Sequence, residues 1–320
     1  VIKDFVYRDC KFEINGPVAT FTISNPAARN AYSKQTWEGM FNAAQVVRED
    51  DSIKVLVLTG DPEGKTFCAG LNVKNLAKNR EKSNQGERVE EPWTYNQGSQ
   101  YDRMKRDKGA IYGSTIPTDA ISPGHAQYMW WREQELRGGY WRPRPLNFVK
   151  LPKPVIAMVN GAAMGAGCDL AFHCDIIIAS EQAFFGWNYL HRGMVTAEGG
   201  CYFLPRLCGY HRTLEILFTG DRISAQQAYE WDLINHVVPH DELESYTYNL
   251  AQRIATESPP LALGMIKYAV QRGFNDYVHN LELVHEEVIR ACNRVLAQTN
   301  DALEGMKAFV EKRKPNYTGT

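Results

Sequence analysis

The 320-residue sequence has no excess of either charge, no long apolar run and no closely spaced cysteine pair. Lysine and arginine together number 36, against 37 aspartates and glutamates. No overall field therefore draws the chain to nucleic acid or to an anionic membrane, although local cations can still hold an anionic ligand. No run approaches the roughly 18 apolar residues that a membrane span needs. We expect neither nucleic acid nor a membrane as a partner.

The cysteine pattern excludes two further classes of site. There are seven cysteines, an odd number, and none are spaced as CxxC, the pattern typical of zinc and redox sites. No metal-ligand spacing, Walker loop or Rossmann fingerprint is present, so we predict no metal and no separate cofactor. The thiols are expected to be reduced and packed as small apolar groups. The first residues, 1–5, have no signal-peptide pattern, and together these features predict the cytoplasm.

The first half of the chain alternates buried strands with helices. Strands are predicted at 12–15 and 18–24, the second with an apolar face of alternate residues. Ser33 is a candidate cap for a helix with apolar residues at i, i+3, i+4 and i+7 from Trp37. Continuous apolar runs at 55–59, 155–159 and 175–179 predict strands buried on both faces. Strand–helix–strand order at this spacing indicates an α/β fold with a largely parallel sheet.

The pattern becomes helical from about Ser224. We therefore divide the chain into an α/β core over 1–223 and a C-terminal helical region over 224–320. The predicted helices there cover 225–231, 243–257, 260–272, 277–298 and 301–312.

A polar segment at about 79–145 fits neither pattern. It contains nine tryptophans and tyrosines between Trp93 and Trp141, and a structureless loop of that length is improbable within a compact domain. We interpret it as an insertion whose aromatic side chains pack over part of the core, with a short helix expected at 132–137.

Two glycine-rich turns are the candidate sites of chemistry. The first, 66–72, follows the buried strand at 55–59, and the second, 160–170, runs from the strand at 155–159 into a helix start. Small residues let the backbone turn sharply and present its N–H groups. Unpaired N–H groups at a helix start favour a developing negative charge. Either turn alone is weak evidence, but together they predict a shared oxyanion site.

Six short motifs, in this order along the chain, resemble those of the enoyl-CoA hydratase/isomerase (crotonase) superfamily. They are FCAG at 67–70, PVIAMVNG at 154–161, GAGCDLA at 165–171, CD at 174–175, FG at 185–186 and TGDRISA at 219–225. The resemblance covers 10–75 and 150–317, where the tail FVEKRKP at 309–315 is also similar. It does not extend to the long insertion.

The resemblance implies a spiral of ββα repeats followed by C-terminal helices used in trimerisation, so a homotrimer or homohexamer is expected. It also implies an acyl-CoA thioester whose carbonyl oxygen accepts hydrogen bonds from two backbone amides. By position these amides belong to Ala69 and Ala166. Fixed backbone donors stabilise an enolate without reorganising, and losing one costs about 3 kcal/mol.

The acid–base residues depart from the family's hydratase pattern. Hydratases of this family hold water between two glutamates, whose positions correspond here to Asp169 and Tyr189. Tyrosine, with a reference pKa near ~10, is a poor base but can donate or relay a proton. Glu198, where the family has a small residue, is the candidate compensating carboxylate. The structural alternative is that Glu198 only complements a helix dipole. His191 is expected to be a surface or packing residue.

Coenzyme A enters as part of the substrate, not as a cofactor. The resemblance places its nucleotide and pantetheine near the turn after the first strands and near the first glycine-rich turn. A basic residue near the C-terminus is a further candidate, although such residues are usually only solvated. The candidate CoA-binding residues are Ala28, Arg29, Ala31, Lys65, Cys68, Lys312 and Lys314.

Three functions follow. The first is hydration or dehydration of a 2-enoyl-CoA, with Glu198 and Asp169 as the acid–base pair and a bulky or alicyclic acyl group under the aromatic insertion. The second uses the same enolate for double-bond isomerisation or for C–C hydrolysis of a cyclic keto-acyl-CoA. The third is a non-catalytic binding protein with this fold.

Overall fold

Two β-sheets form the centre of the structure, a computed structural model that describes residues 5–73, 77–78, 81–82, 85, 146–196, 199–258, 260–273 and 300–313. Within this part of the chain, one sheet has seven strands in the order β1-β2-β3-β4-β6-β8-β11, and the other has four in the order β10-β9-β7-β5. The strands are β1 Phe5–Tyr7, β2 Cys10–Asn15, β3 Val18–Ile23, β4 Val55–Gly60, β5 Thr66–Cys68, β6 Val155–Val159, β7 Ala162–Met164, β8 Ile176–Ser180, β9 Phe184–Gly186, β10 Ile223–Ser224 and β11 His236–Val238.

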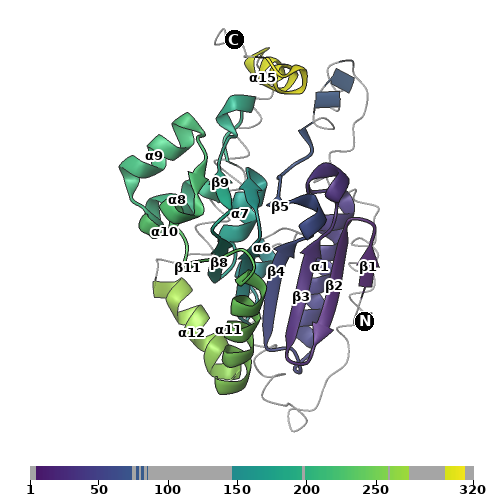
Figure 1. Cartoon of the computed structure of the whole chain (residues 1–320), viewed down its shortest axis with the longest axis vertical. Coiled ribbons are helices and arrows are strands. Elements are labelled where there is room, and N and C mark those ends of the chain that lie inside the picture. The colour runs from purple at the N-terminus through teal and green to yellow at the C-terminus, as the bar shows by residue number, and fades with distance from the viewer. Residues whose placement is uncertain are drawn as a thin grey trace, which may run out of the picture.

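The large sheet is parallel from β3 to β11, as its continuous apolar runs predicted. Side chains of β4 alternate between two cores, because successive residues of a strand point to opposite faces. Leu56 and Leu58 belong to the core that includes Trp37 and Met40 of α1 (Lys34–Glu49). Their neighbours Val55 and Val57 belong to the core beneath α11 (Leu243–Glu257). The two helices thus pack on opposite faces of the sheet (Figure 1).

A strand pair recurs three times, at β4–β5, β6–β7 and β8–β9. In each pair a strand of the large sheet is followed by a short strand of the small sheet. The middle pair continues into α7 (Ala166–Phe172) and completes a ββα unit. Because β5, β7 and β9 run parallel to one another, their carboxyl ends meet at one edge of the small sheet. The segments that leave this edge build the candidate site.

Helix α1 begins where the sequence predicted. The Ser33 hydroxyl accepts the Thr36 N–H, and the Thr36 hydroxyl accepts the Ser33 N–H, which makes a capping box. At the other end, the buried Lys153 side chain donates to the carbonyls of Val47 and Asp50, at 2.5 and 2.7 Å. A buried cation thus satisfies carbonyl groups at the C-terminal end of the helix.

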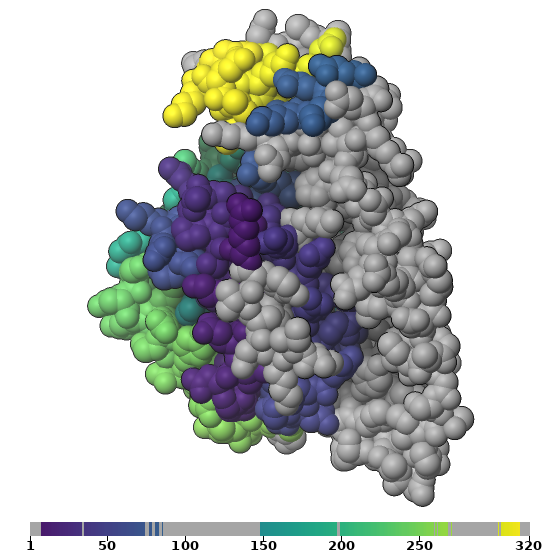
Figure 2. Space-filling model, turned by 90° about the vertical axis from the view of Figure 1, so that its right-hand side faces the viewer, coloured from purple at the N-terminus to yellow at the C-terminus, as the bar shows by residue number. Residues whose placement is uncertain are grey.

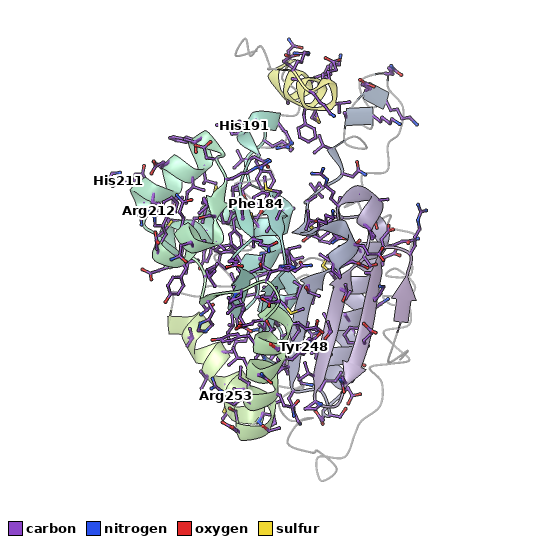
Figure 3. The ribbon with its side chains drawn as sticks, in the orientation of Figure 1. Phe184, His191, His211, Arg212, Tyr248 and Arg253 are labelled. Atoms are coloured by element: carbon purple, nitrogen blue, oxygen red, sulfur yellow. The ribbon has the colours of Figure 1, made fainter. Side chains whose placement is uncertain are left out.

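The C-terminal region is mostly helical but also contributes a strand. β11 pairs with β8 in the large sheet, so the expectation of an all-helical segment after 224 is wrong at that point. Tyr248 of α11 lies against the sheet, and its hydroxyl is 2.8 Å from that of Thr20 (Figure 3). The division at 223/224 stays a prediction. The remaining helices and 3-10 turns are η1 Pro26–Ala28, η2 Pro62–Gly64, α6 Leu146–Val149, η4 Leu190–Arg192, α8 Gly200–Leu207, α9 Tyr210–Thr219, α10 Ala225–Glu230, α12 Pro260–Gly273 and α15 Asn300–Glu311.

Some predicted elements lie outside the described residues. These are the helices expected at 132–137 and 277–298 and, apart from 81–82 and 85, the aromatic segment at 79–145. Glu198 and Lys314 also lie outside.

Candidate functional site

The two glycine-rich turns pack directly against each other at the edge of the small sheet. Gly70 has a φ of +80°, and a Cβ there would lie 2.5 Å from the Met164 carbonyl oxygen and 3.3 Å from the Ala166 nitrogen. A Cβ on Gly167 would lie 2.2 Å from the Cys68 carbonyl oxygen. Both positions therefore require glycine, because any side chain would push the two turns apart. The predicted convergence of the turns is present.

The first of the two predicted amide donors needs correction. The Ala69 N–H donates to the Arg29 carbonyl at 3.2 Å, so it is already engaged in holding the turn. The Gly70 N–H faces the Cys68 sulfur at 3.4 Å. The next amide, that of Leu71, has no hydrogen-bond acceptor among the described residues, and neither has that of Ala166. Leu71 and Ala166 are thus the available donors where the turns meet.

Asp169 is fully buried, and its carboxylate accepts hydrogen bonds from three side chains. The indole N–H of Trp187 donates to Oδ1 at 2.9 Å, and the Tyr189 hydroxyl donates to Oδ2 at 2.6 Å. The Thr196 hydroxyl lies 3.2 and 3.0 Å from the two oxygens. Bonds to a charged acceptor are shorter and stronger than neutral ones, so this carboxylate is held firmly in place.

Burial separates the roles of Asp169 and Tyr189. The carboxylate has no exposed surface. The water-holding role that the resemblance to hydratases implied for Asp169 stays a prediction. Tyr189, 6% exposed, is bonded to it. The Tyr189 ring also lies beside the second turn, since a Cβ on Gly165 would be 3.8 Å from its Cζ. The Tyr189 side chain therefore contacts the carboxylate with its hydroxyl and lies with its ring beside the turn that carries the Ala166 amide.

Two residues of this network were missed in the sequence analysis. Trp187 and Thr196 belong to segments that precede and follow η4, and both are almost completely buried. Thr196 also accepts the Gly200 N–H at 3.2 Å, which ties the start of α8 to the carboxylate. Trp187, two residues before Tyr189, carries the available signal: a buried indole needs an acceptor for its N–H.

The predicted CoA-binding residues lie on two adjoining turns. η1 and η2 contact each other, and each is followed by a basic residue with left-handed backbone, Arg29 and Lys65. Both of these side chains are exposed, while Ala28 is half-buried and Ala31 is buried. Two cations on neighbouring turns can hold the phosphates of a nucleotide. The binding of CoA at these two turns stays a prediction.

Asn30 fixes the two turns relative to each other. It is fully buried, and its side-chain amide donates to the Asp61 and Thr66 carbonyls at 2.9 and 2.7 Å. Its Oδ1 accepts the Asn25 N–H at 3.1 Å. Thr66 in turn donates its hydroxyl to the Arg29 carbonyl at 2.7 Å. One buried amide thus connects the η1 turn to the η2 turn and to β5.

The thiol of Cys68 does not face a ligand. It is fully buried, and burial raises its pKa to about 12. The thiol of Cys168 on α7 is likewise buried, and burial raises its pKa well above the usual value. A thiol that stays protonated is a poor nucleophile. Cys68 can therefore serve a bound CoA only through its backbone.

The remaining candidates lie on η4 and at the end of α15. Lys312 is exposed at the end of α15 and has left-handed backbone. His191 lies on η4 and is exposed (Figure 3). Among the described residues, no group of three or more His, Cys, Asp or Glu side chains is placed to hold a metal ion. In the same residues we find no helix with the length and apolar character that crossing a membrane requires.

Comparisons with known proteins agree with this geometry. The family model described as enoyl-CoA hydratase/isomerase matches residues 13–101 and 133–320. The chain is 30% identical over 304 residues to 1,2-epoxyphenylacetyl-CoA isomerase of Escherichia coli K12, covering 94% of this chain and 95% of that protein. It is also 30% identical over 302 residues to 2,3-dehydroadipyl-CoA hydratase of the same strain, with coverages of 94% and 95%.

A solved structure supports the same fold. The carnitinyl-CoA dehydratase of Mycobacterium avium 104 has a TM-score of 0.70 at 26% identity, covering 98% of this chain and 99% of that one. The α/β class and the spiral of ββα repeats are confirmed. The trimerisation role of the C-terminal helices stays a prediction.

Proposed function

The chain belongs to the enoyl-CoA hydratase/isomerase family, and on that premise we propose that it moves the double bond of an enoyl-CoA through a thioester enolate. The observation that carries this proposal is the hydrogen bond from the Tyr189 hydroxyl to the buried carboxylate of Asp169. This pair lies beside the place where the two glycine-rich turns are in contact. Members of this family act on CoA thioesters. The reaction type and the residue roles given below are our proposal.

The enolate oxygen is assigned to the amides of Leu71 and Ala166. Both N–H groups lack an acceptor among the described residues, and the turns that carry them are in contact. As negative charge moves from the α-carbon to the thioester oxygen, these fixed donors gain strength without having to reorganise. An amide of this kind contributes about 3 kcal/mol to the transition state.

Tyr189 and Asp169 carry the proton. The phenol oxygen takes a proton from C2 of a 3-enoyl-CoA while its own proton passes to Asp169 Oδ2 along the 2.6 Å hydrogen bond. The C2–H bond breaks and its electron pair forms the C1–C2 double bond of the enolate, while the carbonyl pair moves to the thioester oxygen. When the carbonyl re-forms, the C1–C2 pair shifts to C2–C3, and the pair of the former C3–C4 double bond takes a proton at C4. The same relay, run in reverse, returns that proton. The substrate and product differ only in the position of the double bond, so no co-reactant is needed.

Isomerisation fits this geometry better than hydration does. Hydration needs groups that hold a water molecule at the β-carbon, whereas the Asp169 oxygens are buried and bonded to three side chains. Moving a proton between two carbons needs only one carrier, and the Tyr189–Asp169 pair supplies it. The exposed Arg29 and Lys65 are assigned to the CoA phosphates. Ala28, Ala31 and the Cys68 backbone are assigned to the nucleotide and pantetheine.

A direct assay tests the proposal. Purified protein incubated with an unbranched 3-enoyl-CoA in D₂O should generate the conjugated thioester absorbance of the 2-enoyl-CoA, with deuterium at C4 whenever the carried proton exchanges with solvent. Tyr189→Phe and Asp169→Asn should each lower kcat about a hundredfold or more. Tyr210→Phe is the control, because Tyr210 is 67% exposed. Turnover of Tyr189→Phe within threefold of wild type would remove the phenol from the mechanism.

Hydration, which the sequence favoured, is the second candidate. The Thr196–Asp169 hydrogen bond anchors the chain two residues before Glu198, and in this case we assign the Glu198 carboxylate to the water. Relatives named as hydratases also share this architecture. Incubation of a 2-enoyl-CoA in H₂¹⁸O separates the candidates, because only hydration places the heavy oxygen on the β-carbon. In that case Glu198→Gln should abolish the labelling.

A further inference from the structure

Helix α15, far along the chain from both turns, contacts both sides of the candidate site. It lies at one end of the molecule, next to η4 (Figure 1) and against the segments 77–78 and 81–82 (Figure 2). On one side it approaches the segment that follows the first turn, and on the other the 3-10 turn that follows Tyr189. The two sides have no direct strand pairing, because β7 lies between β5 and β9.

Met306 makes the first contact. Its side chain is 1% exposed and forms a small apolar cluster with Ala77, against which Leu71 and Val73 pack. Leu71 carries the amide assigned above to the thioester oxygen. Removing the Met306 side chain would remove the part of this cluster that α15 supplies, while the hydrogen bonds of the turn itself would remain.

Phe309 and Ala302 make the second contact. The Arg192 guanidinium lies 4.3 Å from the centre of the Phe309 ring, and it donates to the Asn188 carbonyl at 2.6 Å. Asn188 directly precedes Tyr189. A Cβ on Gly193, whose φ is +60°, would lie 2.7 Å from the Ala302 Cα, so the chain after η4 touches the helix backbone.

We propose that α15 holds the two sides of the site in register, with Met306 and Phe309 as positioning residues. Met306 acts through Leu71, and Phe309 acts through Arg192 and Asn188 on Tyr189. The amide donor and the proton carrier must contact the same substrate at the same time. A shift of about 1 Å in the position of either group costs roughly a hundredfold in rate. A single helix that contacts both supports keeps their separation fixed. The roles assigned to Leu71 and Tyr189 rest on the proposed function.

Hydrogen exchange tests the proposal independently of turnover. In the full chain without ligand, Met306→Ala should increase amide exchange severalfold in 69–73 and also in 188–194, on the far side of the helix. Phe309→Ala should show the reciprocal effect in 69–73. Val310→Ala is the matched control, because Val310 lies on the same helix and is 42% exposed. Increased exchange confined to the segment beside each substitution would overturn the proposal.

Kinetics give the second readout. Met306→Ala and Phe309→Ala should each lower kcat about tenfold or more, with KM for the acyl-CoA within twofold of wild type, and Met306→Leu should restore kcat because it conserves volume. A kcat equal to that of Val310→Ala in folded protein would overturn the positioning role. If Met306→Ala does not fold, the more exposed Phe309→Ala carries both tests. If the wild-type protein has no isomerase activity, the hydrogen-exchange result still tests the role of α15. Failure of the proposed function and failure of the positioning role can therefore be told apart.

Discussion

Adding one methyl group at Gly70 should separate the two turns of the site. The new Cβ would lie 2.5 Å from the Met164 carbonyl oxygen, whereas C···O contacts are ordinarily about 3.3 Å. The first turn must therefore retreat by roughly 0.8 Å, and displacement on this scale costs about a hundredfold in rate. We expect Gly70→Ala to lower kcat by about that factor.

Gly209→Ala separates this effect from backbone strain. Gly209 has a φ of +79°, close to the +80° of Gly70, but a Cβ there would meet nothing within 4 Å. Both variants lose about 1–3 kcal/mol, because a positive φ is unfavourable for alanine, and Gly209, whose ψ is 170°, lies in a region essentially restricted to glycine. At about 2.1 cal/mol/K of unfolding entropy per residue, that loss lowers the Tm of a 320-residue chain by roughly 1.5 to 4.5 °C. Only Gly70→Ala also brings the two turns into collision.

The measurements are kcat and KM on the 3-enoyl-CoA and thermal unfolding followed by circular dichroism, at a temperature where both variants are folded. We expect Gly209→Ala to keep its kcat and to lose only thermal stability. The reasoning is refuted if Gly70→Ala also keeps its kcat while losing the same stability, since the amides would then tolerate a displaced turn.

Three further predictions follow. Asn30→Ala leaves the Asp61 and Thr66 carbonyls without their buried donor. Each unsatisfied carbonyl lowers the free energy of unfolding by about 1–3 kcal/mol, so Tm should fall and KM for acyl-CoA should rise. An unchanged KM would show that Asn30 has no part in CoA binding. Burial raises the thiol pKa of Cys68 to about 12, so the native enzyme should resist iodoacetamide there at pH 8, and mass mapping of labelled Cys68 at the denatured rate would contradict this. Burial lowers the pKa of Lys153 to about 8 from 10.5. The unfolded chain therefore binds more protons between those values, and stability relative to Lys153→Met should rise with pH there, by up to about 3 kcal/mol; urea titrations that show no such rise would refute it.

The elements that were predicted correctly are those whose cause is local. The apolar run over 155–159 contains its own evidence of burial and matches β6 residue for residue. The Ser33 cap and the helix over 243–257 were likewise determined by nearby residues. β11 was missed because it is only three residues long and its partner β8 lies far away in the sequence. A strand whose stability comes from a distant neighbour leaves little local pattern.

The site shows the same division. Glycine spacing was sufficient to predict that two turns would meet, because Gly70 and Gly167 are required by the contact itself. It was not sufficient to identify the free amide. Whether the Ala69 N–H is available depends on the Arg29 carbonyl, forty residues earlier in the sequence, and no pattern near Ala69 reports that hydrogen bond. The partners of Asp169 on Trp187 and Thr196 were invisible for the same reason.

The exchange of two family glutamates for an aspartate and a tyrosine changes the charge that a substrate meets. Two carboxylates close together repel each other, so they need a water or a ligand between them. Asp169 and Tyr189 instead attract, and they bond directly at 2.6 Å. The shorter acid keeps its charge buried behind the longer phenol, while Trp187 and Thr196 occupy its remaining lone pairs. Beside the second turn there is then a neutral hydroxyl bonded to a carboxylate. Such a pair transfers a proton to or from carbon without binding water, and once a proton has reached Asp169 the pair is neutral beside the enolate.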